Sequence, residues 1–422
     1  MEHANRTIRP LTQQDLEAYL DIYLNAYPAY KTLDEACREH YREKHRLELR
    51  EDRQVQTVGL FEGDVLIATM KLILFSMNCF GRMQTACGLM ALEVHPLHKK
   101  KGAALEMVRY FEDYARRHGA LLTLLLPFQI SFYRRMGYGF AGKLYEYHLP
   151  TAVLPKPDGE ARRHLRLLQP EDFDRVLACH SRFAAQNHGM VEKFEEEVRA
   201  ARTDVQVRRI GYCADDGTLR GYVAYRFESA SDTNYTRNRL SVEELVYDDG
   251  VVLRALLGAL KLQEDLAQTV LLRTGEEDFH HLLEDPQDVS GNYIDYGFLQ
   301  TNVSAIGTMF KILDPAAFVT ATAYRTLPQG TLTAAFCYRD ELAHRDCRTV
   351  LRFDGGRWSA LQEEAPAEVT VTCRQGDLAS LLMASCGLEG MVRLGAVAVT
   401  GPWQQLAQLL HYGQKPWLNS DY

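Results

Sequence analysis

The sequence lacks every feature that would mark a membrane or secreted protein. Its longest apolar stretch, residues 120–132, is interrupted by Thr123, Pro127 and Gln129 and is too short to cross a bilayer. The first residues, Met-Glu-His-Ala-Asn-Arg, lack the apolar core of a signal peptide. Nine cysteines are scattered without a Cys-x-x-Cys pair. We therefore expect a cytoplasmic protein with reduced thiols, no disulfide framework and no metal site.

An excess of positive charge is also missing. Lysine and arginine number 48 against 56 aspartates and glutamates, so the formal net charge is −8. This balance argues against a broad nucleic-acid surface. Hydrophobic residues make up 46% and charged residues 25%, which is ordinary for globular proteins. At roughly 150 residues per domain, a chain of 422 residues predicts two or three domains.

Two breaks divide the sequence into three segments. The first is the proline-rich stretch 149–159, and a softer one lies near residues 307–315, where short strands are predicted to begin. We therefore expect domains at 1–152, 153–306 and 307–422.

The first two segments begin alike. Residues 8–11 are followed by Asp15-Leu16-Glu17, and residues 165–168 are followed at the same spacing by Asp172-Phe173-Asp174. Each pattern predicts a short strand and then a capped helix. A hairpin turn follows in each segment, at 62–64 and at 215–217. We interpret this as a duplicated α/β domain.

The third segment has a different pattern. Asp354-Gly355-Gly356 indicates a hairpin, residues 368–373 and 396–399 indicate strands, and residues 403–410 indicate a last helix. Asp377 is predicted to be the N-cap of a further helix. The segment is typical of an α+β domain.

The stretch most informative about chemistry is residues 91–105. An apolar strand stops at Pro96, a basic loop with Lys99-Lys100-Lys101 ends at Gly102, and an amphipathic helix then extends to about His118. A strand, a glycine-containing loop and a helix N-terminus form a phosphate site, because free N–H groups and the positive helix end face the anion. A solvated basic loop is the alternative, and it would be preferred for a lysine triplet alone.

The elements that follow also fit a known pattern. Residues 121–126 predict an apolar strand, and residues 132–140 read Phe-Tyr-Arg-Arg-Met-Gly-Tyr-Gly-Phe. In this order, the two motifs resemble the Gcn5-related N-acetyltransferase superfamily. Its core pattern is Arg/Gln-x-x-Gly-x-Gly/Ala, a strand, and a Phe-Tyr-x-x-x-Gly-Phe/Tyr turn. Lys99 stands in place of the usual Arg or Gln and keeps a positive charge.

A narrower resemblance covers the whole chain. Residues 98–102, His-Lys-Lys-Lys-Gly, and 132–139 are similar to the His-Arg-Arg-Arg-Gly loop and Ile-Tyr-Gly-Arg-Phe-Gly-Tyr-Gly turn of the Eis (enhanced intracellular survival) N-acetyltransferases. The resemblance implies an α+β fold with mixed sheets: tandem acetyltransferase-like domains and then a sterol-carrier-like α+β domain. It further implies acetyl-CoA as cosubstrate, an aminoglycoside-like, polyamine-like or protein-lysine amine, and a homo-oligomer (trimer or hexamer).

The resemblance also implies roles for particular residues. The backbone of Leu92 and Val94 would pair with the pantetheine arm, Tyr133 would be the general acid, and the terminal carboxylate of Tyr422 would be the general base. The pyrophosphate would be held by Lys99, Lys100, Gly102, Ala103 and Ala104.

The chemistry gives these roles a reason. Amine attack on a thioester requires a base for the ammonium proton and an acid for the thiolate. Glu93 competes with Tyr422 for the role of base, because it lies on the strand beside the expected acetyl position.

The second domain is not expected to bind the coenzyme. Its corresponding stretch, residues 242–254, carries Asp248 and Asp249 where the lysines would be, and two carboxylates should repel a pyrophosphate. Two rival functions stay open. One is a longer-chain N-acyltransferase, and the other is a lipid or sterol carrier with vestigial acetyltransferase domains.

Overall fold

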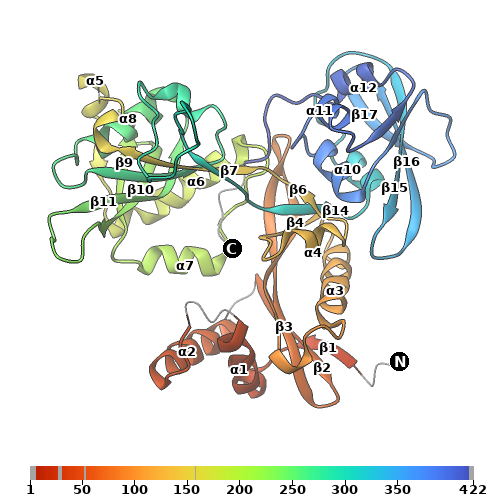
Figure 1. Cartoon of the computed structure of the whole chain (residues 1–422), viewed down its shortest axis with the longest axis horizontal. Coiled ribbons are helices and arrows are strands. Elements are labelled where there is room, and N and C mark those ends of the chain that lie inside the picture. The colour runs from red at the N-terminus through yellow and green to blue at the C-terminus, as the bar shows by residue number, and fades with distance from the viewer. Residues whose placement is uncertain (1–5, 27–30, 52–53, 157, 418–422) are drawn as a thin grey trace.

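The computed structural model describes residues 6–26, 31–51, 54–156 and 158–417. The strands form two seven-stranded sheets and one five-stranded sheet. Each sheet, with its helices, is one mixed α+β unit of the molecule. The expected fold class, α+β with mixed sheets, is confirmed in this arrangement. Figure 1 shows the long strands β3 and β4 extending from the N-terminal end of the molecule up between the other two units.

The first sheet has the order β1-β2-β3-β4-β5-β14-β6. Its neighbours are antiparallel except for β4 and β5, which are parallel and pair over Ala86–Leu89. Its strands are β1 Arg6–Pro10, β2 Val55–Glu62, β3 Val65–Cys79, β4 Arg82–Val94, β5 Leu122–Leu125, β6 Gly139–Phe140 and β14 Met309–Ile312. Its helices are η1 Gln13–Asp15, α1 Leu16–Ala26, α2 Glu35–Glu51, η2 Pro96–His98, α3 Ala103–Arg117 and α4 Ile130–Arg134.

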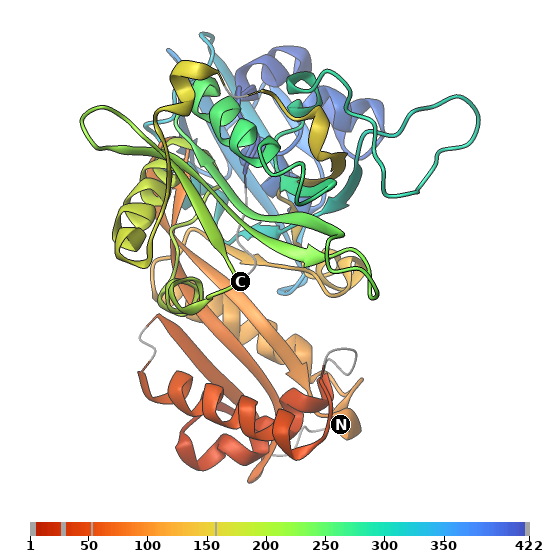
Figure 2. The ribbon, with the colours of Figure 1, turned by 90° about the vertical axis from the view of Figure 1, so that its left-hand side faces the viewer.

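Two helical layers cover this sheet. The buried face of α3, with Met107, Val108 and Phe111, packs on the sheet in one hydrophobic core. On α1, Tyr19 and Ile22 pack with Phe61 in a smaller core. Figure 2 shows α1 and α2 together at the N-terminal end of the molecule.

The second sheet has the order β13-β7-β12-β11-β10-β9-β8. Its strands are β7 Lys143–Pro150, β8 Leu165–Leu167, β9 Arg208–Cys213, β10 Leu219–Ser229, β11 Asn238–Tyr247, β12 Thr269–Thr274 and β13 Val303–Ile306. Its helices are η3 Thr151–Val153, α5 Gly159–Arg162, η4 Pro170–Asp172, α6 Phe173–Gln186, α7 Glu195–Thr203, α8 Gly250–Lys261 and η5 Phe279–Leu282.

Two strands, β7 and β14, pair in a sheet other than the one expected from their place in the sequence. β7 belongs by sequence to the expected segment 1–152 but pairs with β12 and β13 of the second sheet. β14 belongs to the expected segment 307–422 but pairs with β5 and β6 of the first sheet. The expected boundaries therefore do not coincide with the sheets. A strand's alternating pattern shows that it is half-buried, but not which sheet it joins.

The third sheet has the order β17-β16-β15-β18-β19. Its strands are β15 Leu332–Asp340, β16 Arg345–Asp354, β17 Arg357–Leu361, β18 Val369–Thr372 and β19 Ala398–Thr400. Its helices are α9 Pro315–Ala321, α10 Gln375–Leu382, α11 Leu388–Arg393 and α12 Trp403–Leu410. The expected hairpin at 354–356 joins β16 to β17.

One helix start differs from the expectation. The N-cap of α10 is Arg374, not Asp377, which lies inside the first turn. Asp377 instead accepts a hydrogen bond from Arg134 Nη2 at 2.8 Å and so ties α10 to α4. A negative charge is favourable both at the N-cap and within the first turn of a helix, so charge alone does not distinguish these two positions for Asp377. The hydrogen bond from Arg134 accounts for its position inside the turn.

The segment after α12 threads between the three units. Trp417 N donates to His188 O at 2.7 Å, and the Trp417 ring packs against Phe183 of α6. Glycines make this route possible: a Cβ on Gly189 would lie 2.7 Å from Pro416, and one on Gly275 would lie 3.0 Å from the Trp417 ring. The C-terminal segment is thus fixed in a glycine-lined slot as far as residue 417.

Candidate active site

The site begins at an irregularity in β4. Ala91 has φ of +50°, and the pairing of β4 with β3 shifts register between Thr69 and Lys71. Such a bulge bends a strand and redirects its side chains. It lies beyond the part of β4 that pairs with β5, and Leu92, Glu93 and Val94, which follow it, form one wall of a cavity.

The basic loop forms the next wall. After η2, Lys100 adopts φ of +61° and Gly102 adopts φ of +84°, and α3 begins at Ala103. The left-handed conformation at Gly102 favours glycine, and it turns the chain so that the N-terminus of α3 faces the cavity. Lys99 and Lys100 are exposed at its rim.

The structure brings all seven residues expected at the coenzyme into this one space, the basic-loop cavity of about 570 Å³. Tyr133 also lines it, from the buried face of α4. The remaining lining residues are Ala26, Glu93, His98, Leu105, Phe128, Gln129 and Phe132. Sequence reasoning had not selected Phe128 or Gln129, which follow β5 without any motif of their own.

A second space, the interdomain cavity of about 680 Å³, meets the first. Leu92, Phe128 and Tyr133 line both cavities. The interdomain cavity also carries four charged side chains, from α2, β3 and α7: Lys44, Lys71, Glu196 and Glu197. Its other lining residues are Tyr23, Leu89, Met90, Ala91, Leu126, Pro127, Phe194 and Ala200.

The charged residues of the interdomain cavity could not be found from sequence spacing, since they come from three distant elements. Lys71 Nζ lies 2.8 Å from Glu48 Oε2 and 3.8 Å from Glu196 Oε2. Among the described residues, Oε2 of Glu196 and Oε2 of Glu197 have no hydrogen-bond partner although both atoms are buried. The run Glu195-Glu196-Glu197 was the one sequence signal, and it resembles an ordinary solvated helix start.

The Glu93 side chain is buried rather than exposed at the mouth of the basic-loop cavity. The residue is 2% exposed, and its carboxylate lies 4.0 Å from Lys31 Nζ and accepts a 3.4 Å hydrogen bond from Thr69. Burial raises the pKa of the Glu93 carboxyl, while Lys31 and Lys71 act against that shift. A buried carboxyl with a raised pKa can act as a proton acceptor near neutral pH.

Tyr422 lies outside the described residues, so its proposed role stays a prediction. The described part of the tail ends at Trp417, which packs against Phe183 of α6 and donates to His188 O. Within the described chain, no group of three His, Cys, Asp or Glu side chains is arranged as metal ligands. In the same part, no helix is both long and apolar enough to span a membrane.

The second sheet has the same strand–loop–helix order but a different helix start. Asp249 caps α8 by accepting hydrogen bonds from the N–H groups of Val251 and Val252, at 2.9 and 3.0 Å. Arg220 donates to Asp248 and Asp249. The helix end that would attract a phosphate thus already holds a carboxylate of its own chain.

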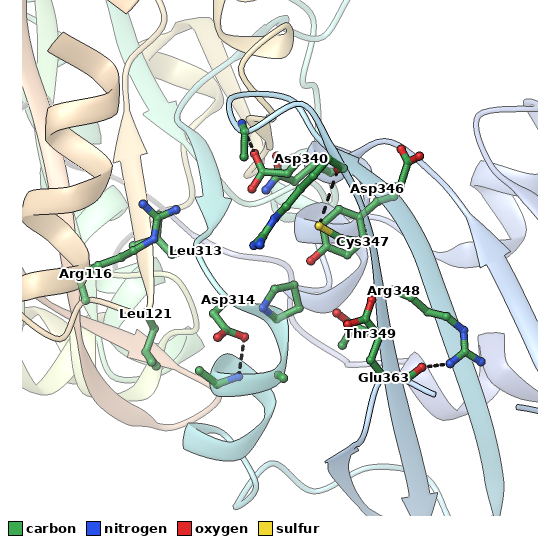
Figure 3. Close-up of a pocket in the computed structure, with 18 of the residues that line it drawn as sticks. Arg116, Leu121, Leu313, Asp314, Asp340, Asp346, Cys347, Arg348, Thr349 and Glu363 are labelled. Carbon is green, nitrogen blue, oxygen red and sulfur yellow. Dashed lines mark hydrogen bonds between the residues drawn. The ribbon is translucent and has the colours of Figure 1, made fainter. Parts of the chain in front are cut away.

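A larger cavity, of about 840 Å³, lies apart from these residues, between the end of α3 and the β15–β16 hairpin (Figure 3). Its polar groups are largely engaged by their own neighbours. Asp314 caps α9 through Ala317 N at 3.0 Å, and Arg348 donates to the carbonyl oxygens of Glu363 and Ala365. This cavity contains none of the residues expected at the site.

Two family models match the chain, and both describe an acetyltransferase (GNAT) domain. One matches residues 7–141 and the other residues 189–300. The chain carries two GNAT acetyltransferase domains. The first contains the basic-loop cavity and the second contributes α7 to the interdomain cavity. The acyl donor of GNAT acetyltransferases is acetyl-CoA.

The chain is also similar in sequence to one bacterial protein and shares its fold with solved structures. An uncharacterized N-acetyltransferase of Streptomyces avermitilis is 24% identical over 249 residues, which cover 56% of this chain and 59% of that relative. A probable N-acyltransferase from Enterococcus faecalis V583 shares the fold, with a TM-score of 0.79, 16% identity and 99% and 100% of the two chains covered. Eis1 from Mycobacterium abscessus has a TM-score of 0.74, 20% identity and the same coverage.

Proposed function

We propose that the protein is an N-acetyltransferase that transfers the acetyl group of acetyl-CoA to an amine in its first GNAT domain. The observation that carries the proposal is the meeting of two cavities at Leu92, Phe128 and Tyr133. One cavity has the basic loop and helix N-terminus that suit a pyrophosphate. The other has buried carboxylate oxygens of Glu196 and Glu197 that suit a cation.

The roles of the chain's own groups follow from the proton balance. Lys99, Lys100 and the N–H groups at Gly102–Ala104 would hold the donor's phosphates. The Tyr133 hydroxyl would donate a proton to the leaving thiolate. A carboxylate would take the proton from the attacking ammonium. We assign that carboxylate to the C-terminus at Tyr422, as the family resemblance implies, with Glu93 as the competing candidate.

The second domain is proposed to be a wall of the acceptor site rather than a second enzyme. Asp249 on the N-terminus of α8 supports this, since it occupies the place of an anion. The finer proposals from the resemblance are an Eis-like enzyme with aminoglycoside-like, polyamine-like or protein-lysine acceptors, a sterol-carrier-like third domain and a homo-oligomer. Longer-chain acyl transfer, or lipid carriage without catalysis, remains the alternative.

The proposed function is tested by thiol release from acetyl-CoA in the presence of a panel of amines. We expect amine-dependent release, and Tyr133→Phe should lower turnover by about 10²-fold while leaving acetyl-CoA affinity nearly unchanged. Phe132→Leu, next to it on α4, is the matched packing control. Near-normal turnover of Tyr133→Phe would leave Tyr133 as a packing residue only. Binding of a fluorescent lipid without any binding of acetyl-CoA would favour the carrier.

The two candidate bases make opposite predictions. If the terminal carboxylate is the base, removing Tyr422 or adding a C-terminal tag should nearly abolish transfer but preserve folding and acetyl-CoA binding. If Glu93 is the base, the tagged protein stays active and Glu93→Gln loses activity. Both variants are measured in one amine assay, and an active tagged enzyme would end the assignment to Tyr422.

A further inference from the structure

A lysine of the chain itself lies beside the proposed site. Lys31 is 7% exposed, and its Nζ lies 3.1 Å from the centroid of the Tyr23 ring and donates to Tyr23 O at 2.8 Å. The same Nζ lies 4.0 Å from Glu93 Oε1, an atom without a hydrogen-bond partner among the described residues.

Lys31 itself lines neither cavity, but two residues beside its Nζ do, one in each cavity. Tyr23, which lies under the ammonium, lines the interdomain cavity. Glu93, its charged neighbour, lines the basic-loop cavity together with Ala26, the last residue of α1. Lys31 Nζ therefore lies between Tyr23, which lines the interdomain cavity proposed for the amine, and Glu93, which lines the basic-loop cavity proposed for acetyl-CoA.

The surroundings of Lys31 resemble a site built for an amine. An aromatic face, a carbonyl oxygen and a carboxylate are the groups that recognise an alkylammonium ion. Burial lowers the pKa of Lys31, with Lys71 and Lys44 acting in the same direction and Glu93 against them. A lowered pKa increases the fraction of neutral, nucleophilic amine at neutral pH.

We propose that Lys31 is an acetyl acceptor within its own chain, so that the protein acetylates its own Lys31 Nζ when no competing amine is bound. This inference rests on the proposed function, which supplies acetyl-CoA as donor.

The reaction balances in atoms and protons. Glu93 takes a proton from the Lys31 ammonium, and the neutral nitrogen attacks the thioester carbon. The C–N bond forms, the C–S bond breaks, and the nitrogen loses its second proton. One proton goes to the coenzyme thiolate through Tyr133, and one is released to solvent. The products are N-acetyl-Lys31 and free coenzyme A.

The test incubates the full chain with acetyl-CoA and no amine, followed by intact-mass and peptide mass spectrometry. We expect close to one acetyl group per chain, at Lys31. Its rate constant should be independent of protein concentration, because the step is intramolecular. Lys31 should react roughly tenfold or more faster than Lys44, a more exposed lysine of the interdomain cavity, since its position replaces a bimolecular encounter.

Variants separate enzymatic from chemical acetylation. Lys31→Arg should remove the modification, whereas the matched Lys143→Arg, at an exposed position of β7, should keep it. Tyr133→Phe or an added amine acceptor should slow it. Labelling of exposed lysines before Lys31, or a rate unaffected by Tyr133→Phe, would overturn the inference.

The two proposals fail in different ways. Amine-dependent thiol release with an unmodified Lys31 would overturn only this inference and leave Lys31 as a structural partner of Glu93. Absence of both acetyl-CoA binding and thiol release would overturn the proposed function, and this inference with it.

Discussion

At the scale of single residues, buried charges join distant parts of the chain. Lys311 of β14 is fully buried, and its Nζ donates to both Glu112 oxygens of α3, at 2.9 and 3.1 Å, and to Met136 O at 3.0 Å. Burial raises the pKa of Glu112, and Lys311 opposes that shift. A lysine in a strand pattern looks from sequence like a solvent-facing residue, so this contact could not be predicted.

Removing one member of this pair should destabilise the protein strongly. Lys311→Met leaves the Glu112 carboxylate buried without its main partner, so we expect a loss of about 3–5 kcal/mol in the free energy of unfolding. Chemical denaturation measures it. The double variant Lys311→Met/Glu112→Leu should recover most of the loss, because an apolar pair replaces the ion pair. Equal stability of the single and double variants would contradict this account.

At the scale of elements, local patterns predicted local structure well. The unit of β4, basic loop and α3 was predicted because its signals, Pro96, Gly102 and the apolar face of the helix, lie within one stretch of chain. Seven residues of the basic-loop cavity lie in or beside this unit and were expected together from the family resemblance, whereas Phe128 and Gln129 were not expected. The interdomain cavity was missed because Lys71 and Glu196 meet only through the packing of α7 on the first sheet. No spacing rule encodes such a contact.

The slot around the C-terminal segment gives a prediction at this scale. In Gly275→Ala the new Cβ would lie 3.0 Å from the Trp417 ring, so the tail must shift. If the tail carries the base, turnover should fall by roughly tenfold while acetyl-CoA affinity is kept. Steady-state kinetics and a coenzyme titration measure the two effects. Gly297→Ala is the control, since its Cβ meets nothing within 4 Å. Unchanged turnover in Gly275→Ala would argue against a tail-borne base.

At the scale of the whole molecule, one histidine joins all three units. His188 follows α6, its Nδ1 accepts from Phe80 N at 3.1 Å, and its Nε2 hydrogen bonds to Met383 O at 3.0 Å. The ring also stacks on Phe80 with centroids 4.2 Å apart. Burial lowers the pKa of His188 to about 4.

This histidine should make stability depend on pH. The unfolded chain takes up the proton near pH 6.5, whereas the folded chain resists it until about pH 4. Stability is therefore kept above pH 6.5 and lost as the pH falls through that window, by roughly 2 kcal/mol between pH 7 and 5. Denaturation at several pH values measures it. His188→Gln should flatten that slope and His281→Gln, at an exposed position, should not. Identical slopes in all three proteins would rule out His188 as the source.

The placement of β7 and β14 has a consequence for how the protein is made. Translation proceeds from the N-terminus, yet Leu125 of β5 can pair with Met309 of β14 only after residue 309 has been synthesised. Meanwhile β7, which follows β6, belongs to the second sheet, and its partner β12 has not yet been synthesised. The half that contains the basic-loop cavity therefore cannot complete its sheet during translation until the second domain has emerged. An unfinished chain would expose the open edge of β5, so premature termination should yield aggregates rather than a working fragment.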